Sequence, residues 1–479
     1  MSISPGEFLV EDAIRSAIRL LDGAIQHDRD RIKVVKPAVL TSAKMDDLVK
    51  FAVFGESEEE RDAARWVIWE LAQETGCGPA SIHELYLARG RGDVASFTVP
   101  AMNLRVLAYH SARAAFRAAL KRKAAALIFE IARSEIAYTE QRPAEYTAVI
   151  LGAALREGFR SPVFVQGDHF QVSAAKYKTG PDKEVEAIRM LIDEGLAAGF
   201  FNIDIDTSTL VDLSFPTLDE QQRENYERAA ELAAYVRLKE PKGVTVSIGG
   251  EIGEVGGKNS TVEELTAYMD GFNKSLKKRN KDTVGLSKIS VQTGTSHGGV
   301  VLSDGSIASV KLDLAALDAL SHAARKQYGM GGAVQHGAST LPEDAFTNFP
   351  KHGACEIHLA TGFQNMVFDH PKIPAPLRAR IRDWIVENCA AERKASDSEQ
   401  QFIYKTRKKA IGPFKKEMWH MPDEVLGAIS DDLEARFGFL FDQLGIAGSA
   451  ESVAKYVKAP VMRHRGGAAA APDDAEAGE

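Results

Sequence analysis

The sequence predicts a (β/α)8 barrel, or TIM barrel, with a helical N-terminal extension and a helical C-terminal region. Short apolar runs alternate with helical patterns through the middle of the chain, and eight such runs can be counted. Eight βα units in succession are typical of this barrel. A doubly wound open sheet usually has a GxGxxG turn after its first strand, and no such turn follows the first run here. The barrel is therefore the expected fold.

The eight apolar runs are short enough to be buried parallel strands, and most are separated by helical stretches. The carboxyl ends of such strands meet at one mouth of a barrel, where its chemistry is normally found. The expected strands are Phe97–Asn103, Ala126–Ala132, Val163–His169, Phe200–Asp206, Gly243–Ile248, Ile289–Thr293, Gly332–His336 and Ala354–Leu359.

Regions outside the barrel differ in composition. The region before the barrel contains two helical patterns, Phe8 to Leu21 and Glu58 to Leu71. The second pattern stops at Gly76, and glycine is typical of helix ends. The region after the barrel is charged, and its basic patch at 405–409 is expected to be a solvated helix face. The predicted segments are the extension at 1–94, the barrel at 95–393, the C-terminal region at 394–465 and a disordered tail at 466–479.

Composition excludes several classes of protein. The chain has 479 residues and a net charge of -8, which argues against nucleic acid as a partner. Its three cysteines lack CxxC spacing, as expected in a reducing cytoplasm. No apolar run reaches the roughly 18 residues of a membrane span, and the N-terminus does not have the pattern of a signal peptide. We expect a cytoplasmic protein that binds neither membrane nor nucleic acid.

Histidines stand at the ends of several expected strands. His169 ends the third, His297 follows the sixth and His336 ends the seventh. Three imidazoles at one barrel mouth can bind one catalytic Zn2+ and leave a coordination position open for substrate. Asp168 lies next to the first histidine, where a carboxylate can act as a general base. A lone histidine on a strand is usually structural, so the prediction depends on the set.

Small and hydroxylated residues follow the last two strands. Gly337 and Ser339 come after the seventh strand, and Thr361 comes after the eighth. Backbone N–H groups and hydroxyls bind phosphate, and TIM barrels often place a phosphate beside these two strands. Ordinary βα turns would also explain both stretches, so the two interpretations stay open at this point.

Seven motifs in order give the region 95–393 a resemblance to the class II, zinc-dependent ketose-bisphosphate aldolases, which act on fructose and tagatose bisphosphates. Each motif alone is weak, but their order and their positions on the expected strands make the resemblance specific. The motifs are VPAMN ending at Asn103, VQGDH ending at His169, IDTS ending at Ser208, GGEIGEVGG from Gly249, GTSHG ending at Gly298, QHGAS ending at Ser339 and IHLAT ending at Thr361.

The resemblance implies a reversible retro-aldol reaction that cleaves a phosphorylated ketose into dihydroxyacetone phosphate and an aldehyde. It implies Zn2+ as the cofactor, admits a monovalent cation beside it, and leads us to expect a homo-oligomer. Asp168 would move the hydroxyl proton. The implied zinc ligands are His169, His297 and His336, with Glu251 as an alternative or neighbouring ligand, and the implied substrate and phosphate contacts are Asn103, Gly298, Gly337, Ser339, His358 and Thr361.

Several positions depart from the family pattern. The loop acid that moves protons at the nucleophilic carbon is Asn259, which cannot do acid–base chemistry. The strand-eight asparagine is His358, the first glutamate of the motif that contains Glu251 is Gly249, and the leading histidine of the motif that ends at His169 is Gln166. These changes favour another phosphorylated ketose over fructose bisphosphate. Candidate replacements for the loop acid are Glu254, Glu263 and Glu264.

Two further interpretations stay open. A non-catalytic aldolase-like subunit that supports a partner enzyme would explain the change at Asn259. The retained histidines and Asp168 favour an enzyme, since a scaffold does not need a carboxylate beside three imidazoles. A zinc hydrolase on the same barrel would use the histidines but would not explain the motifs around Ser339 and Thr361.

Overall fold

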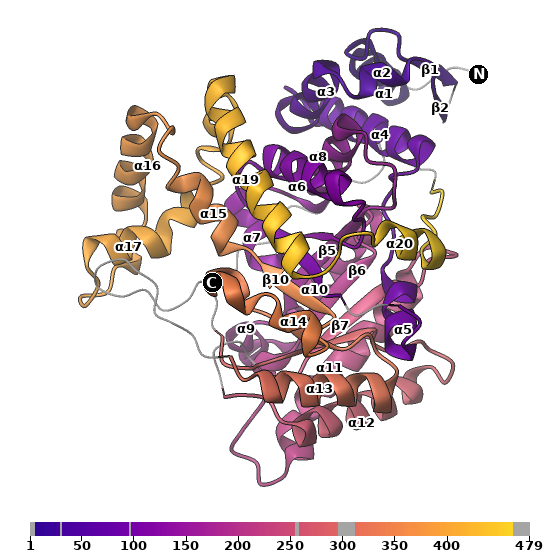
Figure 1. The fold of residues 1–479 in the computed structure, drawn as a ribbon, viewed down its shortest axis with the longest axis vertical. Coiled ribbons are helices and arrows are strands. Elements are labelled where there is room, and N and C mark those ends of the chain that lie inside the picture. The colour runs from indigo at the N-terminus through magenta and orange to yellow at the C-terminus, as the bar shows by residue number, and fades with distance from the viewer. Residues whose placement is uncertain (1–4, 29–30, 95–96, 254–257, 296–311, 463–479) are drawn as a thin grey trace.

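Eight parallel strands close into a barrel in the computed structural model, which describes residues 5–28, 31–94, 97–253, 258–295 and 312–462 (Figure 1). Their order around the barrel is β10-β3-β4-β5-β6-β7-β8-β9, so the predicted (β/α)8 fold is confirmed. The strands are β3 Val99–Asn103, β4 Ile128–Ala132, β5 Phe164–Gln171, β6 Asn202–Asp206, β7 Ser247–Glu251, β8 Lys288–Val291, β9 Ala333–Gln335 and β10 Glu356–Leu359.

Helices that follow the strands pack their apolar faces on the outside of the barrel. Phe116 of the first of them contacts Phe129 of β4, with ring centroids 4.9 Å apart. The helices of this region are α6 Ala108–Arg122, α7 Arg133–Thr139, α8 Pro143–Glu157, α9 Ala174–Thr179, α10 Pro181–Ala197, η1 Ser208–Leu210, α11 Leu218–Lys239, α12 Val262–Arg279, α13 Leu314–Tyr328, η2 Ala338–Thr340, η3 Glu343–Ala345, α14 Asn348–Lys351 and α15 Thr361–Phe368.

The fifth barrel strand lies further along the chain than predicted. We expected it at Gly243–Ile248, but β7 covers Ser247–Glu251 and includes both Gly249 and Gly250. A Cβ atom added at Gly249 would lie 2.2 Å from Oδ1 of Asp204 on β6. Gly249 is therefore required by close packing inside the barrel, although it lies beyond the predicted end of the strand.

The N-terminal extension closes the amino end of the barrel. Asn202 at the start of β6 accepts a hydrogen bond from the Ile82 backbone N–H (2.9 Å), and Arg89 donates to the carbonyl of Ala354 (2.8 Å). Both predicted helices are present, and the second ends at Gly76 with φ = 82°. The hairpin of β1 and β2 was not predicted. The elements are α1 Pro5–Arg19, β1 Ile25–Asp28, β2 Arg31–Val34, α2 Pro37–Leu40, α3 Ala43–Phe54, α4 Glu58–Thr75 and α5 His83–Arg91.

The C-terminal region is helical as predicted and packs beside the barrel (Figure 1). α19 lies against α6, where Arg122 pairs with Asp442 at 2.7 Å. Part of the basic patch departs from the expected solvated face, because Arg407 is buried and pairs with Asp369 at 2.6 Å. The elements are α16 Ala375–Asn388, η4 Ala390–Glu392, α17 Glu399–Thr406, η5 Arg407–Ala410, α18 Lys415–Trp419, α19 Asp423–Gln443 and α20 Ala450–Tyr456.

The predicted disordered tail at 466–479 lies outside the described residues. Among the helices that the structure describes, none combines the length and the apolar character needed to cross a membrane.

Candidate active site

A β-bulge in β5 brings Asp168 and His169 to the barrel mouth. Between Gly167 and Phe170 this strand has two residues where the neighbouring β6 has one, and His169 takes φ = 40°. Neighbouring side chains on a regular strand point to opposite faces, and a bulge redirects one of them. A side chain at Gly167 would collide with the Phe170 ring, 2.4 Å from the Cβ position. The local sequence GDHF thus specifies an irregular strand end with two functional side chains.

His169 meets carboxylates from two neighbouring strands. Its Nδ1 atom lies 3.0 Å from Oδ2 of Asp206 on β6 and 3.3 Å from Oε2 of Glu251 on β7. His336 approaches from β9, with its ring centroid 4.4 Å from that of His169. The mouth cluster consists of Asp168, His169, Asp206, Glu251 and His336.

Imidazole and carboxylate donors of the mouth cluster lie close enough to share an ion. One potential ligand atom each from Asp168, His169 and His336 lie within 4.8 Å of one another, and the same holds for His169, Asp206 and Glu251. Nitrogen and oxygen donors of these kinds suit Zn2+. Predicted ligands His169, His336 and Glu251 therefore come together, whereas His297 lies outside the described residues. Asp206 was not predicted as a site residue.

Burial and crowding of negative charge perturb the pKa values in the mouth cluster. Burial, together with the charge of Asp206, raises the pKa of Glu251 to about 8. Burial by itself would lower the pKa of His169, but the charges of Asp168 and Glu251 outweigh it and raise that pKa well above its usual value. A bound cation would relieve this repulsion, as expected of a metal site.

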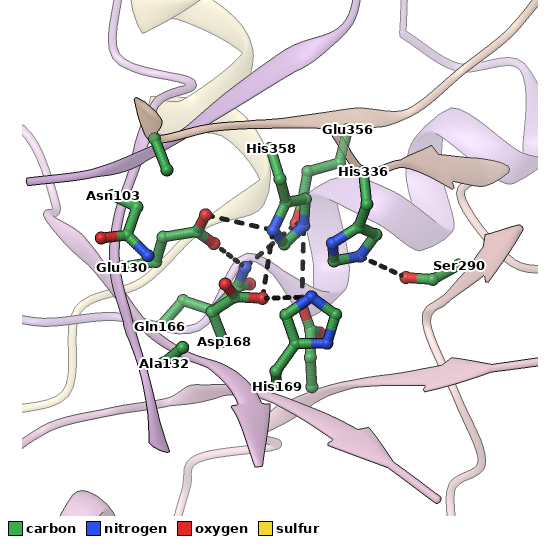
Figure 2. Close-up of polar contacts among 12 residues, drawn as sticks. Asn103, Glu130, Ala132, Gln166, Asp168, His169, Ser290, His336, Glu356 and His358 are labelled. Carbon is green, nitrogen blue, oxygen red and sulfur yellow. Dashed lines mark hydrogen bonds and ion pairs between the residues drawn. The ribbon is translucent and has the colours of Figure 1, made fainter. Parts of the chain in front are cut away.

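His336 is held at a fixed angle between two other imidazoles. Its Nε2 atom lies 3.0 Å from the hydroxyl oxygen of Ser290 on β8, and its ring stacks on that of His358 with centroids 3.9 Å apart (Figure 2). It is 1% exposed. Hydrogen bonding of one ring nitrogen fixes the orientation of a potential metal ligand.

His358 links the mouth to the barrel interior. Its Nδ1 atom lies 3.1 Å from Oε1 of Glu130 and 3.2 Å from Oδ1 of Asp168, and its Nε2 atom lies 2.7 Å from Oε1 of Glu356 (Figure 2). Burial, aided by the charge of Asp168, raises the pKa of Glu130 to about 7. His358 was predicted as a substrate contact, and the structure shows both of its ring nitrogens facing carboxylates.

The predicted phosphate residues of the last two strands lie together. Gly337 adopts φ = 68°, and η2 follows it. The Ser339 hydroxyl accepts a hydrogen bond from the Ala360 backbone N–H at 2.6 Å, which joins η2 to the start of α15 at Thr361. The other predicted phosphate contact, Gly298, lies outside the described residues.

Asn103 ends β3 and is buried beside the mouth. Its amide donates to Glu135, which also pairs with Arg105 at 2.6 Å. The expected substrate contact through Asn103 stays a prediction.

Asn259 contacts a carboxylate that was not among the predicted replacements for the loop acid. Asn259 donates to Asp313 at 3.2 Å. Glu264 accepts from the Thr261 backbone N–H at 2.9 Å and pairs with Lys258 at 2.6 Å, so it caps α12. Glu263 is exposed on the same helix, and Glu254 lies outside the described residues.

Beneath the mouth lies a cluster of buried polar side chains that was not predicted from the sequence. We call it the interior network, and its members come from α5 and four barrel strands. A signal was present, because a charged or amide residue interrupts the apolar strand patterns NIDID, KISV and EIHL. The interior network consists of Tyr86, Gln166, Asp204, Lys288 and Glu356.

The family model for class II fructose-bisphosphate aldolase matches residues 92–423, most of the chain and the whole barrel. The chain belongs to this family. A search of curated proteins finds no significant match.

Two solved structures illustrate how far the fold of this aldolase-family chain is shared. A fructuronate-tagaturonate epimerase from Cohnella laeviribosi is 14% identical with a TM-score of 0.54, and the match covers 91% of this chain and 99% of that one. A probable tagatose 6 phosphate kinase from Sinorhizobium meliloti 1021 is 16% identical with a TM-score of 0.53, covering 74% of this chain and 100% of that one. At these identities the likeness shows the fold alone.

Proposed function

We propose that this member of the aldolase family is a metal-dependent enzyme that reversibly cleaves a phosphorylated ketose into dihydroxyacetone phosphate and an aldehyde. The observation that carries the proposal is the convergence of Asp168, His169, His336 and Glu251 at the carboxyl end of the barrel. A non-catalytic subunit would have no use for this crowding of buried carboxylates, in which burial and the charge of Asp206 raise the pKa of Glu251 to about 8.

Zn2+ would be held by His169, His336 and His297, with Glu251 as an alternative or neighbouring ligand. When bound, the ion would supply Lewis-acid stabilisation of the negative charge that develops on the substrate oxygens. The donor set fits this ion, because imidazoles and a carboxylate already lie within reach of one another without rearrangement of the barrel.

Asp168 is the proposed base for the hydroxyl that becomes the aldehyde. As this proton leaves, the carbon–carbon bond breaks and its electron pair stays on the dihydroxyacetone phosphate half. Oδ1 of Asp168 lies 3.2 Å from Nδ1 of His358, which holds the carboxylate in place. The same group would return the proton when the enzyme runs towards synthesis.

The phosphate of the substrate would bind beside β9 and β10. Support comes from the position of Ser339, whose hydroxyl already joins the two loops through the Ala360 N–H. The first backbone N–H groups of α15, which starts at Thr361, have no partner within their own helix and favour an anion. Gly337 and Gly298 would allow the backbone to approach the phosphate.

A second candidate function is epimerisation of a keto sugar. One observation favours it: Glu130 places a second carboxyl group, with a pKa of about 7, on the same imidazole nitrogen that faces Asp168. Two acid–base groups near one carbon could remove a proton and return it to the other face. The likeness in fold to a fructuronate-tagaturonate epimerase is consistent with this candidate.

One experiment separates the candidates. Purified protein is analysed for metal and then incubated in D2O with phosphorylated ketoses and with ketouronates. The aldolase proposal expects Zn2+ near one per chain and aldehyde release from a phosphorylated ketose. Deuterium incorporation with inversion and no aldehyde would favour the epimerase. A fully metallated protein that changes none of these substrates would favour the non-catalytic subunit.

A further inference from the structure

The interior network occupies a place that TIM barrels usually fill with layers of branched apolar side chains. Lys288 on β8 is fully buried and donates to Oε1 of Gln166 at 2.8 Å, to Oδ2 of Asp204 at 3.0 Å and to Oε1 of Glu356. Each N–H of the ammonium group therefore has an acceptor, and the side chain acts as a counter-ion with no free position for other chemistry.

Glu356 divides its two oxygens between opposite ends of the barrel. Oε2 accepts a hydrogen bond from the hydroxyl of Tyr86, which belongs to α5 of the N-terminal extension. Oε1 points towards the mouth of the barrel. It lies 2.7 Å from Nε2 of His358 and accepts a hydrogen bond from the Gln166 amide at 3.0 Å. One carboxylate thus connects α5, at the amino end of the barrel, to the imidazole of His358 at the mouth.

The barrel is shaped to hold this network. Gly249, where the family has glutamate, provides the space for the pair of Asp204 and Lys288: a Cβ there would lie 2.2 Å from Oδ1 of Asp204 and 2.9 Å from Cε of Lys288. Burial would raise the pKa of Glu356, but Lys288 and His358 outweigh burial and lower it to about 2. The carboxylate is thus kept ionised and able to accept all of its hydrogen bonds.

We infer that Tyr86, Lys288 and Glu356 are positioning residues, which hold the His358 ring in the orientation that directs its Nδ1 atom at Asp168. The N-terminal extension would then help to arrange the catalytic site through Tyr86, although it lies at the opposite end of the barrel. Without the Tyr86 hydroxyl, the buried Oε2 of Glu356 would lack this donor. The carboxylate would rotate to recover a partner and release His358.

The inference is tested with Tyr86→Phe, which removes a single oxygen atom. Tyr109→Phe is the matched control, because Tyr109 is also buried and its hydroxyl also joins the barrel to the extension, donating to Asp46 at 2.6 Å. Side-chain NMR of protein labelled with 15N-histidine follows the Nε2–H signal of His358, assigned by its loss in His358→Gln. This readout does not depend on any enzymatic activity.

We expect Tyr86→Phe to shift or broaden the His358 signal and Tyr109→Phe to leave it unchanged. In the aldolase assay, Tyr86→Phe should lower kcat by about 3–10-fold with KM and metal content unchanged. Glu356→Gln, which keeps the shape of the side chain, should move the same signal and serves as the second variant if Tyr86→Phe does not fold.

An unchanged His358 signal in Tyr86→Phe, or in Glu356→Gln where the first variant fails, would overturn the inference. A kcat loss equal to that of Tyr109→Phe would do so as well. The kinetic arm rests on the proposed function and the NMR arm does not. A parent protein that releases no aldehyde but shows the expected shift would therefore refute the aldolase and leave the positioning role intact.

Discussion

The mouth cluster and the interior network both contain buried carboxylates, but different basic side chains lie beside them. In the interior, Lys288 is shared by Asp204 and Glu356, and every donor of its ammonium group is used. At the mouth, three carboxyl groups lie beside His169, and one of them, that of Asp168, also lies near His336. A buried ammonium group with an acceptor for every N–H leaves no position for a ligand, whereas carboxylates crowded beside imidazoles favour binding of a metal cation. A buried lysine that holds the carboxylates thus distinguishes the structural cluster from the reactive one.

The largest effect is expected from removing a metal ligand at the mouth. His336→Ala should lose bound Zn2+ and all detectable cleavage, since two imidazoles rarely retain a catalytic ion. Metal content after gel filtration measures the first effect and aldehyde release the second. Full zinc content in this variant would refute the ligand assignment.

The Asp168→Asn variant should still bind the metal but should cleave the substrate much more slowly. The amide retains the shape and removes the basicity, so cleavage should fall by about 10²–10⁴-fold, the usual contribution of a positioned general base. Proton exchange at the nucleophilic carbon of dihydroxyacetone phosphate should be less affected, because another group handles that proton. Cleavage at the parental rate would show that Asp168 is structural.

Breaking the interior network should affect stability more than metal binding. Lys288→Met removes the ammonium group that pairs with two buried carboxylates, and the free energy of unfolding should fall by about 3–5 kcal/mol. Chemical denaturation measures this change, and zinc content of the folded fraction provides the comparison. If Lys288→Met lost zinc without losing stability, the distinction between the two clusters would be wrong.

The two clusters should also respond differently to pH. The pKa of Glu251 is raised to about 8 in the folded protein, so its contribution to the stability of the metal-free form is present below about 4.5 and lost as pH rises through about 8. The slope is at most about 1.4 kcal/mol per pH unit for one group. Zn2+ should reverse the loss, so stabilisation by added zinc should grow with pH over this range. Constant stabilisation would argue against Glu251 as a neighbour of the ion.

In the interior, the opposite sign applies to Glu356. Its pKa is lowered to about 2, so its contribution to stability is present above about 4.5 and lost as pH falls towards 2, with or without zinc. Thermal unfolding of both forms across the two ranges checks these expectations together.

The smallest effect is expected from a substitution in the loops after β9 and β10, where the phosphate of the substrate is proposed to bind. Ser339→Ala should weaken substrate binding by about 1–3 kcal/mol through loss of one charge-assisted hydrogen bond, with little change in kcat or metal content. The KM for a phosphorylated ketose measures this effect, and an unphosphorylated analogue is the control. Equal turnover of the two substrates by the parent enzyme would remove the basis for the phosphate site.

The sequence by itself determined the barrel and much of its mouth. Eight apolar runs with helical stretches between them define eight βα units, and parallel strands must then present His169, His336 and Glu251 at one end. These predictions depend only on local patterns and on the rule that the carboxyl ends of parallel strands coincide. The same rule placed Asp168 beside the proposed metal ligands.

Only the tertiary structure decided which polar residues inside the barrel contact one another. Tyr86 and Glu356 are 270 residues apart in the chain, and Lys288 meets Gln166 across 122 residues, so no local pattern could pair them. Gly249 lies just beyond the strand predicted from the sequence, and only the structure shows that Asp204 fills the space beside it. A strand pattern predicts which residues face inward, but the closed barrel decides which of them meet and how their charges balance.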